Sequence, residues 1–259
     1  MQEVDESSVV RAYGPDDRHI LYKHNYKVDD RRAKEWEAME AEKERDRRRM
    51  SFESSGVGAR FLALTLDDFV ADTDERRNAL AKVRAYISEV KEGSHRSLWL
   101  CGNAGCGKTF LAAMIVRECG GKFRRAYEIS DEYAEAGSFG ASRNREAVTA
   151  DYAKAKVLVI DEVGRMGGQT EVEVLFRVLN ARYEAMKPSV IVTNKTKREL
   201  VSYLGKSIFD RFAENSTSIE FSGGSYRSVI RNGGKKDEKH VGGEFQQSTL
   251  QAVRELHSR

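Results

Sequence analysis

A glycine-rich motif constrains this chain more than any other stretch. It reads Gly102-Asn103-Ala104-Gly105-Cys106-Gly107-Lys108-Thr109, which is the pattern G-x-x-x-x-G-K-T of a phosphate-binding loop, or Walker A motif. Glycine reaches backbone torsions that a Cβ atom forbids, so the loop can turn its N–H groups toward phosphate oxygens. An apolar run at 97–101 precedes the motif and a helix-forming segment at 110–116 follows it. This strand, loop and helix order predicts a P-loop NTPase domain.

The motif also predicts the ligands. Lys108 supplies a positive charge for the β- and γ-phosphates of ATP, and the Thr109 hydroxyl supplies a ligand for Mg²⁺. The residues expected to contact the nucleotide are Gly102, Asn103, Ala104, Gly105, Cys106, Gly107, Lys108, Thr109 and Phe110.

A second motif follows about fifty residues later. The apolar run Val157–Ile160 ends in Asp161 and Glu162, which is the Walker B pattern. A continuous apolar run is typical of a buried parallel strand, and the carboxyl end of such a strand faces the ligand. We expect Asp161 to hold Mg²⁺, directly or through water, and Glu162 to polarise the attacking water.

A further buried strand at 189–194 ends in Asn194. This side chain is placed to orient the same water or to contact the γ-phosphate. The alternative is that Asn194 caps the next helix, which is expected to begin near Lys197. Further along the chain, Arg211 could act on the nucleotide of a neighbouring subunit, and Arg227 could reach the γ-phosphate in its own subunit.

Hydrophobic spacing predicts the remaining elements. Strands are expected over 123–129 and 217–221, and helices over 76–90, 130–140, 143–154 and 171–183. The segment between 122 and 145 is locally basic. Solvated surface explains this, and a path for single-stranded nucleic acid is the sharper alternative, although no ladder of aromatic residues accompanies the charges.

The chain divides into three predicted parts. Residues 1–55 form a charged helical segment. The charge-dense stretch Val28–Met50 is either a solvated helix or, with the aromatic stretch before it, a partner-binding arm with Tyr22, Tyr26, Trp36 and Met39 as anchors. A Ser/Gly-rich linker is expected at 51–58. The ATPase domain covers 56–230, and 231–259 is expected to be a flexible polar tail with a short helix at 247–256.

Composition excludes some classes. The net charge of the 259 residues is only +3, so there is no strong overall attraction to nucleic acid or membranes. Three cysteines without a C-x-x-C pair favour reduced, packed side chains rather than a zinc site. No stretch has the length and apolarity of a membrane span, and a cytoplasmic protein without membrane contact is expected.

Taken together, the motifs resemble those of the AAA+ ATPases, and within them the DnaC-like helicase loaders and the IstB-like transposition helper ATPases. The resemblance covers roughly residues 56–230. It rests on 102–109, 157–162, 192–194, 205–212 with its Asp-Arg-Phe, and 225–227.

The resemblance implies an α/β fold, a parallel sheet of strand order 5-1-4-3-2 flanked by helices. It also implies self-association, in which a neighbour completes each ATP site: Arg211 then resembles the arginine finger and Arg227 the second sensor. Loaders of this family grip a hexameric replicative DNA helicase through an N-terminal segment and engage single-stranded DNA.

Our leading hypothesis from the sequence is therefore an ATP-hydrolysing helicase loader. A transposition helper ATPase, whose partner is a transposase, shares every core motif. A nucleotide-switched adaptor with little hydrolysis is a third hypothesis, against which Glu162 and Asn194 argue. A small-molecule kinase fits less well, because the Asp161–Glu162 pair and the trailing arginines suit attack by water.

Overall fold

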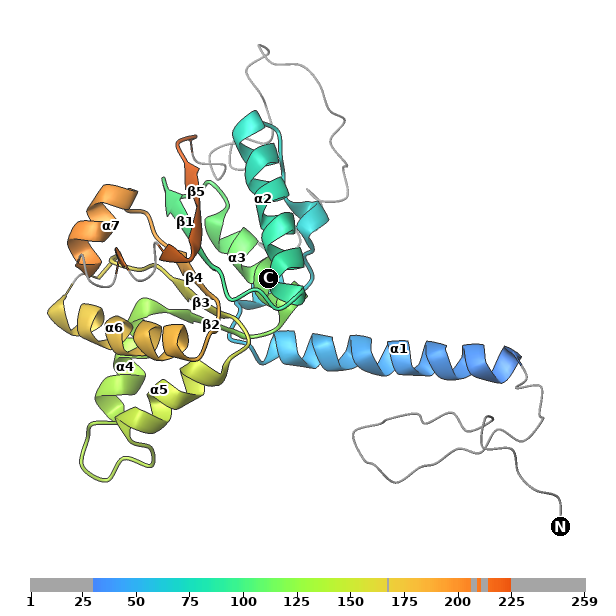
Figure 1. The fold of residues 1–259 in the computed structure, drawn as a ribbon, viewed down its shortest axis with the longest axis horizontal. Coiled ribbons are helices and arrows are strands. Elements are labelled where there is room, and N and C mark those ends of the chain that lie inside the picture. Colours follow the sequence, from blue (N-terminus) through green and yellow to red (C-terminus); the bar gives the residue numbers. More distant parts are fainter. Residues whose placement is uncertain (1–29, 167, 206–208, 211–213, 225–259) are drawn as a thin grey trace, which may run out of the picture. The chain divides into compact units, whose positions relative to one another are not determined.

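The computed structural model describes residues 30–166, 168–205, 209–210 and 214–224 (Figure 1). Contacts divide the chain into two units, residues 1–47 and residues 48–259.

The second unit contains a parallel sheet of five strands in the order β2-β3-β4-β1-β5. The strands are β1 (Ser97–Gly102), β2 (Lys122–Arg125), β3 (Leu158–Asp161), β4 (Ser189–Val192) and β5 (Ser216–Phe221). Read from the other edge, this is the predicted order 5-1-4-3-2, which is confirmed. Because all strands run the same way, β1, β3 and β4 end at one edge of the sheet, where the motif residues follow them.

Helices cover both faces of this sheet (Figure 1). One face carries α2 (Asp74–Lys91) and α3 (Lys108–Cys119), together with the short 3₁₀ turns η2 (Ala59–Phe61) and η3 (Leu66–Asp68). The other face carries α4 (Ala126–Glu135), α5 (Arg145–Lys154), α6 (Gln169–Glu184) and α7 (Lys197–Leu204).

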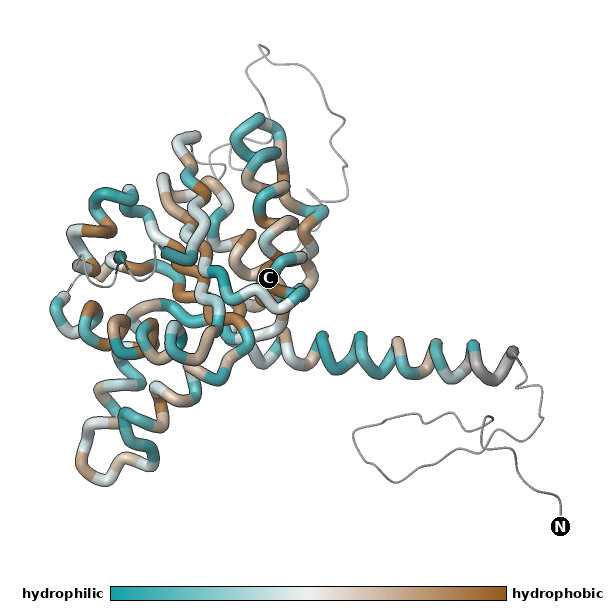
Figure 2. The backbone as a smooth tube through the Cα atoms, viewed as in Figure 1, coloured by the Kyte–Doolittle hydropathy of each residue, from teal (hydrophilic) through white to brown (hydrophobic). Residues whose placement is uncertain are grey.

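Side chains of each strand alternate between the two faces, so the sheet separates two hydrophobic cores. On β1, Leu98 and Leu100 pack with α2 and α3, whereas Trp99 and Cys101 pack on the face of α6 and α7. Apolar residues accordingly concentrate along the strands and α3 (Figure 2). The two-sided burial explains why the central strands β1, β3 and β4 are largely apolar, whereas the edge strands β2 and β5 carry polar residues.

The predicted strand at 123–129 is wrong in its second half. β2 ends at Arg125, and α4 begins at Ala126 instead of near residue 130. The Glu128 carboxylate accepts a hydrogen bond from the Arg125 amide at 2.8 Å, which is the capping interaction of a helix start. Ala126 and Ile129 are buried at helical spacing. A segment this short, with charged residues between its apolar ones, cannot be assigned to strand or helix from periodicity alone.

The predicted linker at 51–58 is also largely wrong. Helix α1 (Asp30–Glu53) continues through Phe52, which is buried in the core of the second unit, as is Val57. The Phe123 amide of β2 donates to the Ser55 carbonyl at 2.8 Å. The segment therefore packs along β2 instead of connecting two parts loosely.

The first unit contains the greater part of α1, which is strongly hydrophilic (Figure 2). Glu44 and Arg47, three residues apart on this helix, form an ion pair of 3.2 Å. Trp36 is 61% exposed and Met39 is 38% exposed. The other predicted anchors, Tyr22 and Tyr26, lie outside the described residues, as do the polar tail and its predicted helix.

The three cysteines are free and buried, as predicted. Burial raises the pKa of the Cys101 and Cys119 thiols to about 11, so both are neutral near pH 7. No helix in the described part of the chain has the length and apolarity needed to cross a membrane.

Candidate nucleotide site

The glycine-rich motif forms a tight loop between β1 and the first turn of α3. Gly107, immediately before α3, has a φ of 103°, and a Cβ atom there would lie 2.7 Å from the Phe69 ring. Gly102 has a φ of 118°, and a Cβ atom would lie 2.0 Å from the Phe221 carbonyl oxygen. Glycine is therefore required at both positions. The loop and the N-terminus of a twelve-residue helix together form a cradle of the kind that binds phosphate.

Lys108 points back into this loop. Its side chain is 5% exposed, and its Nζ atom donates to the carbonyl oxygens of Gly102 at 2.7 Å and Asn103 at 2.6 Å. The Cys106 thiol donates to the same Asn103 carbonyl at 3.0 Å. The ammonium also lies 3.5 Å from the Cys106 sulfur, and none of these contacts is with a carboxylate. The loop thus keeps a positive charge where phosphate oxygens would lie.

Thr109 and Asp161 lie side by side. Asp161 ends β3, is 5% exposed, and accepts hydrogen bonds from the Glu162 amide at 2.8 Å and from the Thr109 hydroxyl. Burial raises the pKa of Asp161 above its ordinary value, while these two hydrogen bonds lower it. A hydroxyl and a carboxylate next to a phosphate cradle are the ligand types that Mg²⁺ takes in P-loop proteins. The residues present therefore fit the predicted metal.

Glu162 starts a tight turn with an unusual backbone. Its φ is 59°, in the left-handed region that costs a residue with a Cβ atom about 1–2 kcal/mol. The turn is fixed by the Thr193 hydroxyl, which donates to the Val163 carbonyl at 2.8 Å, and by the Glu171 carboxylate, which accepts from the Gly164 amide at 2.9 Å. Such strain is held in place by the surrounding structure.

The Glu162 carboxylate is paired with Arg165, a residue that sequence reasoning missed. Arg165 Nη1 lies 2.7 Å from Glu162 Oε1, and its amide closes the turn by donating to the Glu162 carbonyl at 3.1 Å. The only local signal is the three-residue separation across a glycine-containing turn.

Asn194 follows β4, which is adjacent to both β3 and β1, and its side chain is exposed. The alternative prediction, that Asn194 caps the next helix, is wrong. Thr196 is the N-cap of α7, and its hydroxyl accepts from the Glu199 amide at 3.3 Å. Asn194 thus follows the carboxyl end of β4, and Glu162 follows that of the adjacent β3. Arg211 and Arg227 lie outside the described residues.

Three aromatic rings gather beside the loop. Phe110 is in α3, and its ring centroid lies 5.7 Å from that of Phe69 and 6.2 Å from that of Phe61. Phe61 and Phe69 come from η2 and the residue after η3, about forty residues upstream, and no local pattern pointed to them. Together they place an apolar, aromatic wall next to Gly107.

Motifs, spacing and geometry now agree with one family. The model of the IstB-like ATP binding proteins matches residues 38–233, well over half of the chain. The chain belongs to the family of IstB-like ATP-binding proteins. Within this IstB-like chain, the match covers the P-loop, the Walker B strand and Asn194.

Comparison with curated proteins and solved structures agrees. The chain is 27% identical over 199 residues to the replicative helicase loader DnaC of Escherichia coli (strain K12), covering 74% of this chain and 81% of that protein. A crystal structure of the DnaC helicase loader superposes with a TM-score of 0.54 at 17% identity, covering 64% of this chain and all of that one. AMPPCP-bound DnaA from Aquifex aeolicus gives 0.54 at 17% identity, covering 78% and 64%. The IstB-like chain thus has the AAA+ P-loop fold.

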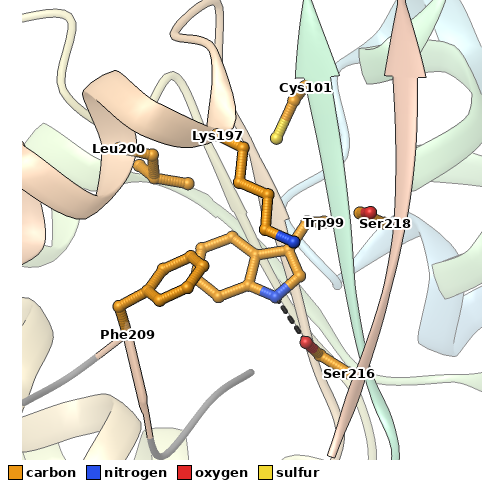
Figure 3. Close-up of a pocket in the computed structure, with 7 residues that line it drawn as sticks. All are labelled: Trp99, Cys101, Lys197, Leu200, Phe209, Ser216 and Ser218. Atoms are coloured by element: carbon orange, nitrogen blue, oxygen red, sulfur yellow. Dashed lines mark hydrogen bonds between the residues drawn. The ribbon is translucent and has the colours of Figure 1, made fainter. Parts of the chain in front are cut away.

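A separate pocket lies beside β1 on the face of the sheet that α6 and α7 cover (Figure 3). Its cavity measures about 60 Å³, and the Trp99 indole in it donates to the Ser216 hydroxyl at 2.7 Å. It is lined by Trp99, Cys101, Lys197, Leu200, Phe209, Ser216 and Ser218. None of these is a predicted site residue, and a nucleotide is far larger than the cavity. This pocket is therefore distinct from the candidate nucleotide site at the P-loop.

Proposed function

We propose that this protein hydrolyses ATP with Mg²⁺ and uses it to load a replicative DNA helicase onto single-stranded DNA. The observation that carries the ATPase part is the gathering of Lys108, Thr109 and Asp161 at one phosphate cradle. The similarity to DnaC across most of both chains supports the loader part.

Each side chain has a role that follows from its place. Lys108 neutralises charge on the β- and γ-phosphates, and Phe110, whose ring is backed by the buried rings of Phe61 and Phe69, contacts the nucleotide from the first turn of α3. Thr109 and Asp161 hold Mg²⁺, which supplies further positive charge to the phosphates. Glu162 polarises the attacking water and Asn194 orients it, because both stand at the ends of adjacent strands.

Two arginines complete the proposal. Arg211 from a neighbouring subunit stabilises charge in the transition state, and Arg227 senses the γ-phosphate within its own subunit. Loss of an arginine finger costs roughly 10³- to 10⁵-fold in rate. We therefore expect ATP hydrolysis to rise with protein concentration as subunits associate.

The ATPase proposal is tested by two substitutions, with nucleotide binding and phosphate release measured separately. Glu162→Gln should bind ATP normally and hydrolyse it at least about 100-fold more slowly, because the general base is lost. Lys108→Ala should bind ATP poorly. Full ATPase activity in Lys108→Ala would remove the basis of the proposal, and an unchanged rate in Glu162→Gln would show that Glu162 is not the general base.

The partner is tested by light scattering on a size-exclusion column. The full chain is mixed with the replicative helicase of its own host or phage in the presence of an ATP analogue. We expect a stable complex that disappears when residues 1–47, the first unit, are deleted. A transposition helper is the second candidate, because the matching family model is that of IstB-like proteins. Failure to bind the helicase, together with capture of a transposase, would favour it.

A further inference from the structure

A short chain of hydrogen bonds connects helix α2 to the catalytic lysine. It begins at Glu75 in the first turn of α2, where the motif analysis found nothing. The Glu75 Oε1 atom accepts from both the amide and the hydroxyl of Ser222, each at 2.6 Å, and Oε2 accepts from the Gly223 amide at 3.1 Å. One carboxylate thus receives three hydrogen bonds from the residues that follow β5.

The Glu75 carboxylate lies very close to the backbone of Gly223. A Cβ atom on Gly223 would lie 2.7 Å from Glu75 Oε2, so glycine lets the backbone approach the carboxylate. The Ser222 hydroxyl and the two amides lower the pKa of Glu75, so it is ionised at neutral pH. Hydrogen bonds to an ionised acceptor are stronger than those between neutral groups. The backbone that follows β5, at Ser222 and Gly223, is therefore held by the Glu75 carboxylate, which is 147 residues away from Ser222 in sequence.

The end of β5 and the residue after it also contact the P-loop, through Asn103. Asn103 Nδ2 donates to the Ser222 carbonyl at 3.2 Å, and the Asn103 amide donates to the Phe221 carbonyl at 3.3 Å. The Asn103 carbonyl in turn accepts from Lys108 Nζ at 2.6 Å. Each contact shares a residue with the next, from Glu75 through Ser222 and Asn103 to the ammonium.

We infer that Glu75 is a positioning residue of the nucleotide site. It fixes the backbone after β5, which fixes Asn103, whose carbonyl orients Lys108 toward the phosphates. The inference rests on the proposed ATP binding and assigns it a residue outside the P-loop and Walker B motifs. Glu75 acts on affinity for ATP and leaves the general base untouched.

The test is a double-mutant cycle in the full chain, read out as the Kd of a fluorescent ATP analogue. Glu75→Ala and Asn103→Ala should each weaken binding roughly five- to tenfold, the usual effect of losing charge-assisted hydrogen bonds. Because both residues belong to one chain of contacts, the double variant should bind no more than about twofold worse than the weaker single variant. Asp74→Ala is the matched control: it is in the same turn, but its carboxylate pairs only with Arg77 in the described part.

A split between kinetic constants separates positioning from general damage. In Glu75→Ala, KM for ATP should rise while kcat at saturating ATP changes less than about twofold, the pattern of a loss confined to binding. Glu75→Gln keeps the side-chain size and one acceptor oxygen, so it should give an intermediate KM, and it replaces Glu75→Ala if that variant does not fold.

Two results overturn the inference while leaving the ATPase proposal intact. One is wild-type affinity in Glu75→Ala when Lys108→Ala has lost binding. The other is a double variant whose loss equals the product of the single losses. Absence of saturable ATP binding in the unmodified chain would instead overturn the proposed function and this inference with it.

Discussion

At the residue scale, the ion pair between Glu162 and Arg165 bears on the proposed general base. One carboxylate oxygen of the proposed general base is occupied by a guanidinium at 2.7 Å. Arg165 is 63% exposed, and exposed pairs are weak, so the contact can open readily. We hypothesise that Arg165 restrains Glu162 until a partner with negative charge, such as a nucleic acid strand, draws the guanidinium away.

Arg165→Ala should therefore raise the basal rate of ATP hydrolysis roughly two- to fivefold, since an exposed ion pair contributes about 0.2–1 kcal/mol. The rate is measured by phosphate release without DNA or helicase. Arg177→Ala, which removes an exposed arginine of α6, serves as control. A fall in the Arg165→Ala rate would show instead that the arginine holds Glu162 in its working position.

At the element scale, the C-terminal turn of α1 belongs with the ATPase unit. Phe52 is 4% exposed, and the Arg117 guanidinium lies 5.4 Å from the centre of its ring. The Ser55 carbonyl accepts from Arg124 Nη1 at 3.0 Å as well as from the Phe123 amide. The boundary between the two units therefore precedes Phe52.

Two truncations test this boundary. Removing residues 1–47 should leave the urea unfolding midpoint of the ATPase unit unchanged. Removing residues 1–58 should lower the free energy of unfolding by at least about 3–5 kcal/mol, the usual effect of deleting one buried phenylalanine. Met50→Ala, which truncates a 70% exposed side chain in the same turn of α1, should have little effect. Coincident unfolding curves for the two truncations would show that 48–58 adds nothing to stability.

At the scale of the whole molecule, local patterns predicted the sheet and the phosphate loop, because both are encoded within short windows. The runs at 157–161 and 189–193 are buried on both faces and read as strands without ambiguity. The strand order came from family resemblance. At β2 the same reasoning failed, since the hydrogen bond between the Arg125 amide and Glu128 starts a helix where the hydrophobic pattern predicted that the strand continues.

Other features could not be predicted because their partners are distant in sequence. Arg182 reads as a surface residue of an amphipathic helix, yet it is fully buried and donates to the Ala155 carbonyl at 2.9 Å and the Ser189 hydroxyl at 2.8 Å. Burial lowers its pKa to about 10. Likewise, no sequence motif marks Glu75. Its contacts with Ser222 and Gly223 form only when the fold brings α2 next to the residues that follow β5.

The packing of residues 51–58 also has a consequence for assembly. An edge strand normally offers outward-facing N–H and C=O groups to which a strand from another molecule can pair. On β2 these groups are already occupied: the Phe123 amide by Ser55, the Phe123 carbonyl by Arg124 Nη1 at 2.8 Å, and the Arg125 amide by Glu128. Hydrogen bonds within the chain thus prevent β2 from pairing with a strand of another molecule, and the self-association proposed above would have to use other surfaces.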